Sequence, residues 1–245
     1  MPLMRFAFVA AAALVLSSCI LSPGKFVSTL HIAKDRSFTF TYAGEVILLD
    51  PAAAMQQGMQ DGLAGAAPPA ENGMGEAGEA DVNMADVAGS APAAPAAETA
   101  QQVAEGKAIA AALSKEVGYR SVEYLGKNKF RVDYAMSGKL DRSFVYPINL
   151  DAKSVIPWVA VEVRTDRTVR VKAMAFGDPD EGMGGAAKPD SPEKERNGTF
   201  TFTTDAELVM QNNEDGMAPG PGTRVVWKVT PTSTTVPTAV VRFAN

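Results

Sequence analysis

Two segments in which aromatic and hydroxyl side chains alternate constrain the fold more than any other feature of the chain. They are Ser37–Tyr42 (SFTFTY) and Thr199–Thr204 (TFTFTT). Successive side chains of a β-strand point to opposite faces, so strict alternation predicts two strands that each bury one face. We expect both strands to lie in one sheet, with their phenylalanines directed toward the core.

The match between the two segments continues without a gap, to Leu48 in the first and Met210 in the second. Each copy has a short break, then an acidic residue (Glu45 or Glu207), then an apolar triplet. Two interpretations stay open. Either a unit was duplicated and its copies are adjacent or pseudo-symmetric, or two hairpin strands reached the same favourable Phe/Thr pattern independently.

Further short runs with alternating or β-branched residues predict about eleven or twelve strands in total. The other candidates are Lys25–Ile32, Glu45–Leu49, Tyr119–Leu125, Lys129–Met136, Arg142–Pro147, Val159–Arg164, Thr168–Met174, Glu207–Gln211, Thr223–Thr230 and Thr238–Phe243. Short turns join 119–125 to 129–136 and 159–164 to 168–174, so we expect antiparallel hairpins.

One helix is predicted from about Ala100 to Val117. Thr99 and Gln102 have the spacing of a capping box. Val103, Ala110, Leu113 and Val117 form its apolar stripe, and Gly118 stands where a C-cap glycine belongs. A second helix is possible from Asp50 to Leu63, with Met55, Met59 and Leu63 on one face. The fold class expected is α+β, mainly antiparallel sheet.

Two polar segments interrupt this pattern. From about 64 to 98 the chain is rich in Ala, Gly and Pro and has no aromatic residue, and 177–198 is a second polar loop. Neither composition offers enough apolar surface to offset the entropy of ordering. We expect a single domain, residues 25–245, that these disordered segments interrupt. The alternative is a domain boundary at 64–98, although 25–63 is small to fold alone without disulfides.

The first eighteen residues have the composition of a secretory leader. Arg5 is followed by an uncharged run, Phe6–Leu16, and then by Ser17, Ser18 and Cys19, the only cysteine of the chain. An apolar run of this length suits a signal peptide and is too short to span a bilayer. An ordinary leader cut at another small residue would leave Cys19 as a lone exported thiol without a disulfide partner.

The run Leu16-Ser17-Ser18-Cys19 resembles the lipobox of bacterial lipoproteins. The resemblance implies removal of residues 1–18, a diacylglycerol on the Cys19 thiol and an acyl chain, such as palmitate, on its new amino group. No other cofactor is implied. Residues 19–24 would then be a tether. In Gram-negative lipoproteins an Asp after the cysteine marks retention at the inner membrane. Ile20 at this position therefore implies the outer membrane, on its periplasmic face.

The wider plan also resembles that of known lipoproteins. Cys19–Lys25, Ser37–Tyr42, Tyr124–Tyr134 and Gly198–Asp205 are similar to stretches in a family of small alphaproteobacterial lipoproteins. A cysteine followed at once by a β-hairpin, with a late glycine-led strand such as Gly222–Val229, is similar to the LppM type of actinobacterial lipoprotein. These resemblances imply an antiparallel α+β envelope domain and bring no catalytic residue.

No residue set in the sequence has the pattern of a known catalytic or metal site. His31, the only histidine, falls within a predicted strand, and we interpret it as a strand residue rather than a general base. One histidine and an acylated cysteine cannot form a zinc site. Asp178–Glu181 and Asn212–Asp215 could offer oxygen ligands to calcium, but neither has EF-hand spacing. We therefore expect no metal site.

Charge and composition exclude further classes of function. The formal net charge is −5, and loss of Arg5 with the leader makes the mature chain more acidic. An acidic chain without a basic run is a poor nucleic-acid binder. We expect Trp158 and Trp227, both in apolar runs, to pack in the core or to line a binding groove.

These observations predict a lipid-anchored envelope protein that is a non-enzymatic module and binds a protein partner or a lipid. The alternative is an envelope hydrolase or transferase that uses carboxylates such as Asp133 and Asp141. A lined apolar cavity would favour a lipid, and an exposed strand edge would favour a protein partner. Carboxylates that converge in a polar cleft would favour the enzyme.

Overall fold

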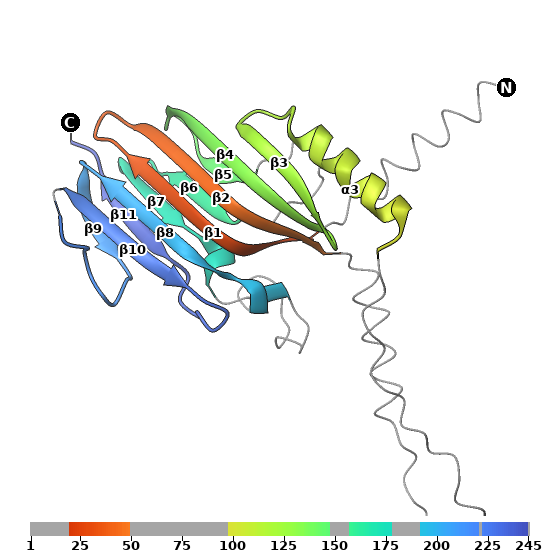
Figure 1. Cartoon of the computed structure of the whole chain (residues 1–245). Coiled ribbons are helices and arrows are strands. Elements are labelled where there is room, and N and C mark those ends of the chain that lie inside the picture. Colours follow the sequence, from red (N-terminus) through yellow and green to blue (C-terminus); the bar gives the residue numbers. More distant parts are fainter. Residues whose placement is uncertain (1–19, 50–97, 148–156, 178–191, 221, 245) are drawn as a thin grey trace, which may run out of the picture.

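In the part of the chain that the structure describes, two β-sheets pack face to face, with one α-helix beside them (Figure 1). The structure is a computed structural model and describes residues 20–49, 98–147, 157–177, 192–220 and 222–244. Because one helix accompanies sheets that are mostly antiparallel, the expected α+β class fits in broad terms, but the fold is mainly β.

Eleven strands lie in the described residues, in line with the number predicted. The six strands of sheet A are, in spatial order, β10 (Thr223–Val229), β8 (Asn197–Thr204), β1 (Ile20–Ile32), β2 (Ser37–Leu49), β4 (Lys129–Lys139) and β3 (Tyr119–Gly126). The five strands of sheet B are β5 (Phe144–Tyr146), β6 (Val159–Val163), β7 (Thr168–Lys172), β11 (Thr238–Arg242) and β9 (Glu207–Gln211). The predicted hairpins β3–β4 and β6–β7 are confirmed.

Aromatic side chains from both sheets fill the space between them. Phe40 of β2 packs on Tyr146 of β5 with ring centroids 4.9 Å apart, and Phe38 packs on Phe144 at 5.0 Å. The phenylalanines of the two similar segments, 38, 40, 200 and 202, are all buried. The prediction that they face the core of one sheet is confirmed, because β2 and β8 both belong to sheet A.

The two similar segments are not neighbours in the sheet. β1 separates them and pairs with β2 on one side and with β8 on the other. The likeness also ends at the break. Glu45–Leu48 continues β2 in sheet A, whereas Glu207–Met210 belongs to β9 in sheet B. The second halves of the two segments therefore have different places in the fold.

One strand pair departs from the expected antiparallel arrangement. β1 and β8 are parallel, with Val27 opposite Thr199 and His31 opposite Thr203. Parallel strands need a long crossover connection. Here the chain passes through strands of sheet B before it returns to sheet A as β8. Hairpin signals are local, so they could not reveal this pairing.

The first strand begins earlier than the sequence suggested. β1 starts at Ile20, and Ile20 and Leu21 pair with Leu49 and Leu48 of β2. Residues 20–24, expected as part of a tether, are thus the first five residues of the strand. Pro23 lies where the register shifts. The ladder therefore needs no backbone N–H at this position, and proline has none.

The predicted helix is present but shorter than expected. The helix α3 (Ala100–Leu113) begins with the predicted Thr99–Gln102 capping box and ends at Ser114. Val117, expected in its apolar stripe, lies beyond the helix and is 80% exposed. Gly118 is not the C-cap. Its φ of +93° belongs to the turn into β3, where its carbonyl accepts a hydrogen bond from Ala135.

Several expectations fall outside the described residues. The possible helix from Asp50 to Leu63 lies there, with all but the last residue of the 64–98 segment and most of the 177–198 loop. One short 3₁₀ turn, η2 (Met174–Phe176), ends just before that loop, and a second, η3 (Pro192–Glu195), lies within it.

Candidate functional site

The residues proposed from sequence as a carboxylate pair do not meet in the fold. Asp133 lies within β4, and Asp141 lies beyond the end of the same strand. Asp133 contacts Arg120 at 3.9 Å, and Asp141 contacts Arg142 at 3.5 Å. The six strand steps from residue 133 to residue 139 span about 20 Å, so the two carboxylates cannot act on one bond.

Both tryptophans belong to the core rather than to a groove wall. Trp158 is 2% exposed and donates its indole N–H to the Leu21 carbonyl at 3.1 Å. Trp227 is 6% exposed and stacks on Phe200, with ring centroids 5.7 Å apart. The aromatic rings fill the interior, and the core-packing interpretation of the two tryptophans is confirmed.

His31 and the Asn212–Asp215 turn have structural partners. His31 Nδ1 lies 2.9 Å from Thr203 Oγ1 on the exposed face of sheet A. Asn212 accepts from the Thr238 N–H and donates to the Val236 carbonyl, which fixes the turn before β10. The described residues contain no group of three His, Cys, Asp or Glu side chains that could hold a metal ion. Asp178–Glu181 lies outside them.

Several strand edges are covered or irregular. α3 packs along β3, with Gly106 against the Tyr124 ring (Figure 1). At β10, Ala218 N–H and the Asn213 amide donate to the carbonyls of Arg224 and Val226. At the outer edge of sheet B, the register of β9 shifts beside Val240. Such features hinder pairing with a strand from another chain.

The exposed face of sheet A carries ordered rows of small polar side chains, which we call the hydroxyl face. Cross-strand contacts join Thr29 to Thr41 at 2.6 Å and Thr39 to Ser137 at 3.1 Å. Register places Thr201 beside Thr29 and Thr203 beside His31. The hydroxyls satisfy one another, so this face is regular and bears little charge at its centre.

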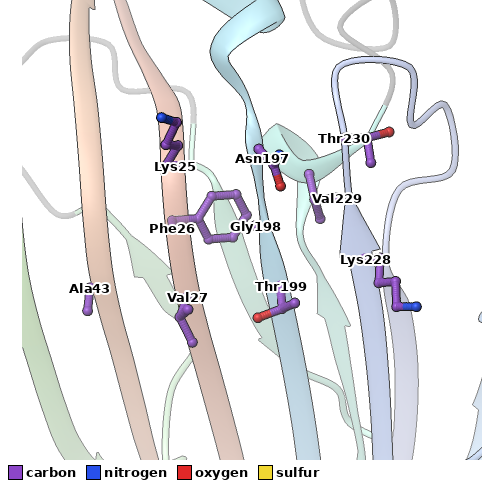
Figure 2. A pocket seen from close by; sticks show the side chains of 10 residues that line it. All are labelled: Lys25, Phe26, Val27, Ala43, Asn197, Gly198, Thr199, Lys228, Val229 and Thr230. Carbon is purple, nitrogen blue, oxygen red and sulfur yellow. The ribbon is translucent and has the colours of Figure 1, made fainter.

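An open pocket lies on this face, toward the end where β1 begins (Figure 2). Its volume is about 680 Å³. Residues from β1, β2, β8 and β10 and the residue after β10 line it: Lys25, Phe26, Val27, Ala43, Asn197, Gly198, Thr199, Lys228, Val229 and Thr230. Val27 and Ala43 give it an apolar floor, and polar side chains surround the floor.

Two lysines from distant parts of the chain flank the pocket. Lys228 of β10 is opposite Thr199 of β8, and Thr199 is opposite Val27 of β1. Lys25 lies two residues before Val27 on β1. Two strand spacings and two residues place the Lys25 and Lys228 Cα atoms on the order of 12 Å apart. In the described part of the chain no carboxylate oxygen lies within 4.0 Å of either ammonium group. The two ammonium groups lie on opposite sides of the pocket (Figure 2).

Hydrogen bonds and close packing fix the start of β8, the strand between the two lysines. Arg196, 3% exposed, donates to the carbonyls of Ala175, Gly177 and Ser233 just before β8 begins. At Gly198 a Cβ atom would lie 2.3 Å from the Phe26 carbonyl oxygen, so the close approach of β8 to β1 requires glycine there. The backbone that carries Asn197 and Thr199 is thus fixed.

Sequence reasoning missed this pocket. Lys25 and Lys228 are more than 200 residues apart in the chain, and only the parallel β1–β8 pair brings them onto one surface. Their one local signal is a lysine on the exposed side of each predicted strand, which by itself does not mark a site.

Comparison with known proteins adds little to this geometry. No protein-family model matches the chain, and no curated protein matches it. The NMR structure of the folded domain of the Mycobacterium tuberculosis LppM protein is similar over 92% of this chain and 93% of that one. Sequence identity is 16% and the TM-score is 0.34, so the likeness is weak and assigns no function. Within the described residues, no helix has the length and apolar character needed to cross a bilayer.

Proposed function

We propose that this chain is a lipid-anchored, non-enzymatic module of the bacterial envelope, and that its pocket binds an anionic group. The observation that carries the ligand is the pair Lys25 and Lys228, which flank one pocket with no carboxylate close to either ammonium in the described residues. The anchor is the diacylglycerol on Cys19. Ile20 after the cysteine favours the outer membrane, on the periplasmic face.

The chemistry of the pocket suits a phosphate group. Two ammonium groups supply charge, and the Asn197 amide with the Thr199 and Thr230 hydroxyls supplies hydrogen bonds around them. Lysine acts as a point charge on phosphate and tolerates varied geometry. The apolar floor, Val27 and Ala43, accepts the carbon part of a ligand. A phosphate of a lipid headgroup and a soluble phosphate ester share this chemistry.

The packed core argues against a lipid held by its tails within the sandwich. Tyr42, Tyr134 and Tyr146 occupy the centre, each at most 2% exposed, and the Tyr146 ring contacts the other two. The open pocket on the outer face offers room for a headgroup instead. The enzyme alternative loses its motivation, because Asp133 and Asp141 are far apart.

A binding experiment tests the pocket without the anchor. The mature chain with Cys19→Ser keeps the side-chain shape but cannot be acylated. It is mixed with vesicles of phosphatidylglycerol and phosphatidylethanolamine, or of phosphatidylcholine alone, and sedimented. We expect association with the anionic vesicles only, weakened by salt, and at least tenfold weaker for Lys25→Gln/Lys228→Gln.

The matched control is Lys34→Gln/Lys172→Gln, which removes the same charge away from the pocket. Equal vesicle binding by the two double variants would overturn the pocket assignment. Inorganic phosphate distinguishes a lipid headgroup from a soluble phosphate ester as the ligand. A site for soluble phosphate binds inorganic phosphate in the absence of vesicles. For the anchor, Cys19→Ala in the full chain should abolish acylation, measured by mass spectrometry. It should also remove the protein from the membrane fraction. Retention of both would overturn it.

A further inference from the structure

We infer that the sandwich rests directly on the bilayer, by the end at which β1 begins, with no tether between lipid and sheet. This inference rests on the proposed acylation of Cys19. β1 starts at Ile20, the residue after that cysteine. Consecutive Cα atoms are about 3.8 Å apart, so the acylated residue stays within one such step of the sheet.

The start of β1 is fixed on both sides. Ile20 and Leu21 are paired with Leu49 and Leu48, and the Leu21 carbonyl accepts the Trp158 indole N–H. Leu48 N–H in turn donates to the Asn128 carbonyl in the β3–β4 turn, at 2.8 Å. The lipid is thus attached to the end of a central strand that three neighbouring segments hold, and the domain cannot swing as it would on a flexible linker.

The surface at this end has the character of a membrane-facing one. We call it the anchor end and define it by Leu21, Leu48, Lys127 and Lys129, which register and the Leu48–Asn128 hydrogen bond bring together. Leu21 and Leu48 are only partly buried, and Lys127 is exposed beside them. Leucines near the headgroup boundary and lysines above it are what an anionic leaflet favours.

Three acidic residues, Glu45, Glu98 and Glu195, lie beside the lysines of this end, and the Glu98 carboxylate accepts from the Lys127 backbone N–H. Lys129 pairs with Glu195 and lies 4.0 Å from Glu45. In the described residues no carboxylate oxygen lies within 4.0 Å of the Lys127 ammonium group, nor of the Lys25 group further along β1. The Lys127 ammonium group, in the turn beside Leu48, can meet headgroup phosphates as the domain rests on the membrane.

Strand length then sets the height of each part above the bilayer. β1 has 13 residues, so the opposite end of the sandwich, at Lys34, stands up to about 40 Å away. Lys25 follows Cys19 by six residues and lies within about 20 Å of it. Direct seating therefore keeps the pocket within about 20 Å of the acylated residue, on the bilayer side of the sandwich.

Site-specific fluorescence tests the seating on the acylated protein in vesicles. Cys19 is the only cysteine, so once it is acylated an introduced cysteine is the single free thiol. Ala100→Cys places a dye at the start of α3, where Glu98 contacts Lys127, and Lys34→Cys places one at the opposite end. With a quencher on the lipid headgroups, we expect several-fold stronger quenching at residue 100 than at residue 34.

A linker variant provides the matched comparison. An insertion of about twelve Gly and Ser residues between Cys19 and Ile20 gives a mean reach of about 20 Å. It should reduce quenching at residue 100 several-fold while the acyl mass remains. Equal quenching at the two sites, or an unchanged signal after insertion, would overturn direct seating alone. Absence of the acyl mass from the native protein would overturn the anchor, and the inference with it, while pocket binding by the Cys19→Ser chain is measured independently.

Discussion

The Glu98 carboxylate accepts a hydrogen bond from the Lys127 backbone N–H at 2.8 Å, and it also contacts the Tyr124 hydroxyl. Lys127 is next to Asn128, whose carbonyl accepts from Leu48 N–H. Leu49, the last described residue before residues 50–97, and Glu98, the first after them, therefore both lie beside the β3–β4 turn, on opposite sides of it. A short connection can join these two points.

Replacement of residues 51–96 by a linker of about six Gly and Ser residues should therefore leave the fold intact. The composition of residues 64–98 predicts a disordered segment, and closing a shorter loop costs less entropy. The replacement shortens the segment about eightfold, which is three successive halvings. We expect a gain of up to about 2 kcal/mol in the free energy of unfolding. Denaturant unfolding measures it, with a scrambled segment of the original length as control. Loss of the cooperative transition in the shortened chain alone would mean that the segment packs on the sandwich.

Gly106→Ala should destabilise the protein although alanine is the better helix former. A Cβ atom at residue 106 would lie 2.4 Å from the Tyr124 ring, so the helix or the ring must move. Overpacking costs about 1 to 3 kcal/mol, which exceeds the gain of about 1 kcal/mol in helix propensity. Lys107→Ala, exposed on the same helix, should change stability by less than about 0.5 kcal/mol. A net gain in stability for Gly106→Ala would show that α3 does not pack on Tyr124.

Local sequence signals predicted the parts of the fold that local physics controls. Alternation fixed the inward side of Phe38 and Phe40, because one face of a strand must leave water. The capping box placed the start of α3 at Ala100, since Thr99 and Gln102 satisfy backbone groups only three residues apart. The end of the helix was missed. Val117 has the right spacing for an apolar stripe, but nothing in the described sandwich covers it.

Long-range pairing decided what the sequence could not predict. Residues 20–24 contain Pro23 and Gly24, which favour a tether locally, and only pairing with β2 makes them a strand. The parallel β1–β8 pair has no local signature, and the pocket depends on it. Lys25 and Lys228 become a candidate site only through two successive strand pairings, so their roles follow from topology rather than from a motif.

The two tryptophans should respond differently to replacement by phenylalanine. Trp158→Phe leaves the Leu21 carbonyl without its donor, whereas the buried Trp227 indole N–H has no hydrogen-bond partner to lose. Both changes remove similar volume from the core, so their difference reports the hydrogen bond. We expect Trp158→Phe to cost about 1 to 3 kcal/mol more than Trp227→Phe in denaturant unfolding. Equal costs would contradict the Trp158–Leu21 bond.

Alkaline solution should unfold the protein through its buried tyrosines. Burial, with smaller effects from Tyr134 and Glu116, raises the pKa of Tyr119 to about 12, and burial raises the pKa of Tyr42 and Tyr146 well above its usual value. In the unfolded chain these groups titrate near about 10. Below that pH the tyrosines do not lower the free energy of unfolding. This free energy falls as the pH rises toward 12, because the unfolded state releases protons that the native state keeps. Denaturant unfolding between about pH 8 and about pH 11 measures the slope. Tyr119→Phe should make the fall shallower, and an unchanged slope in that variant would show that this phenol titrates freely in the folded protein.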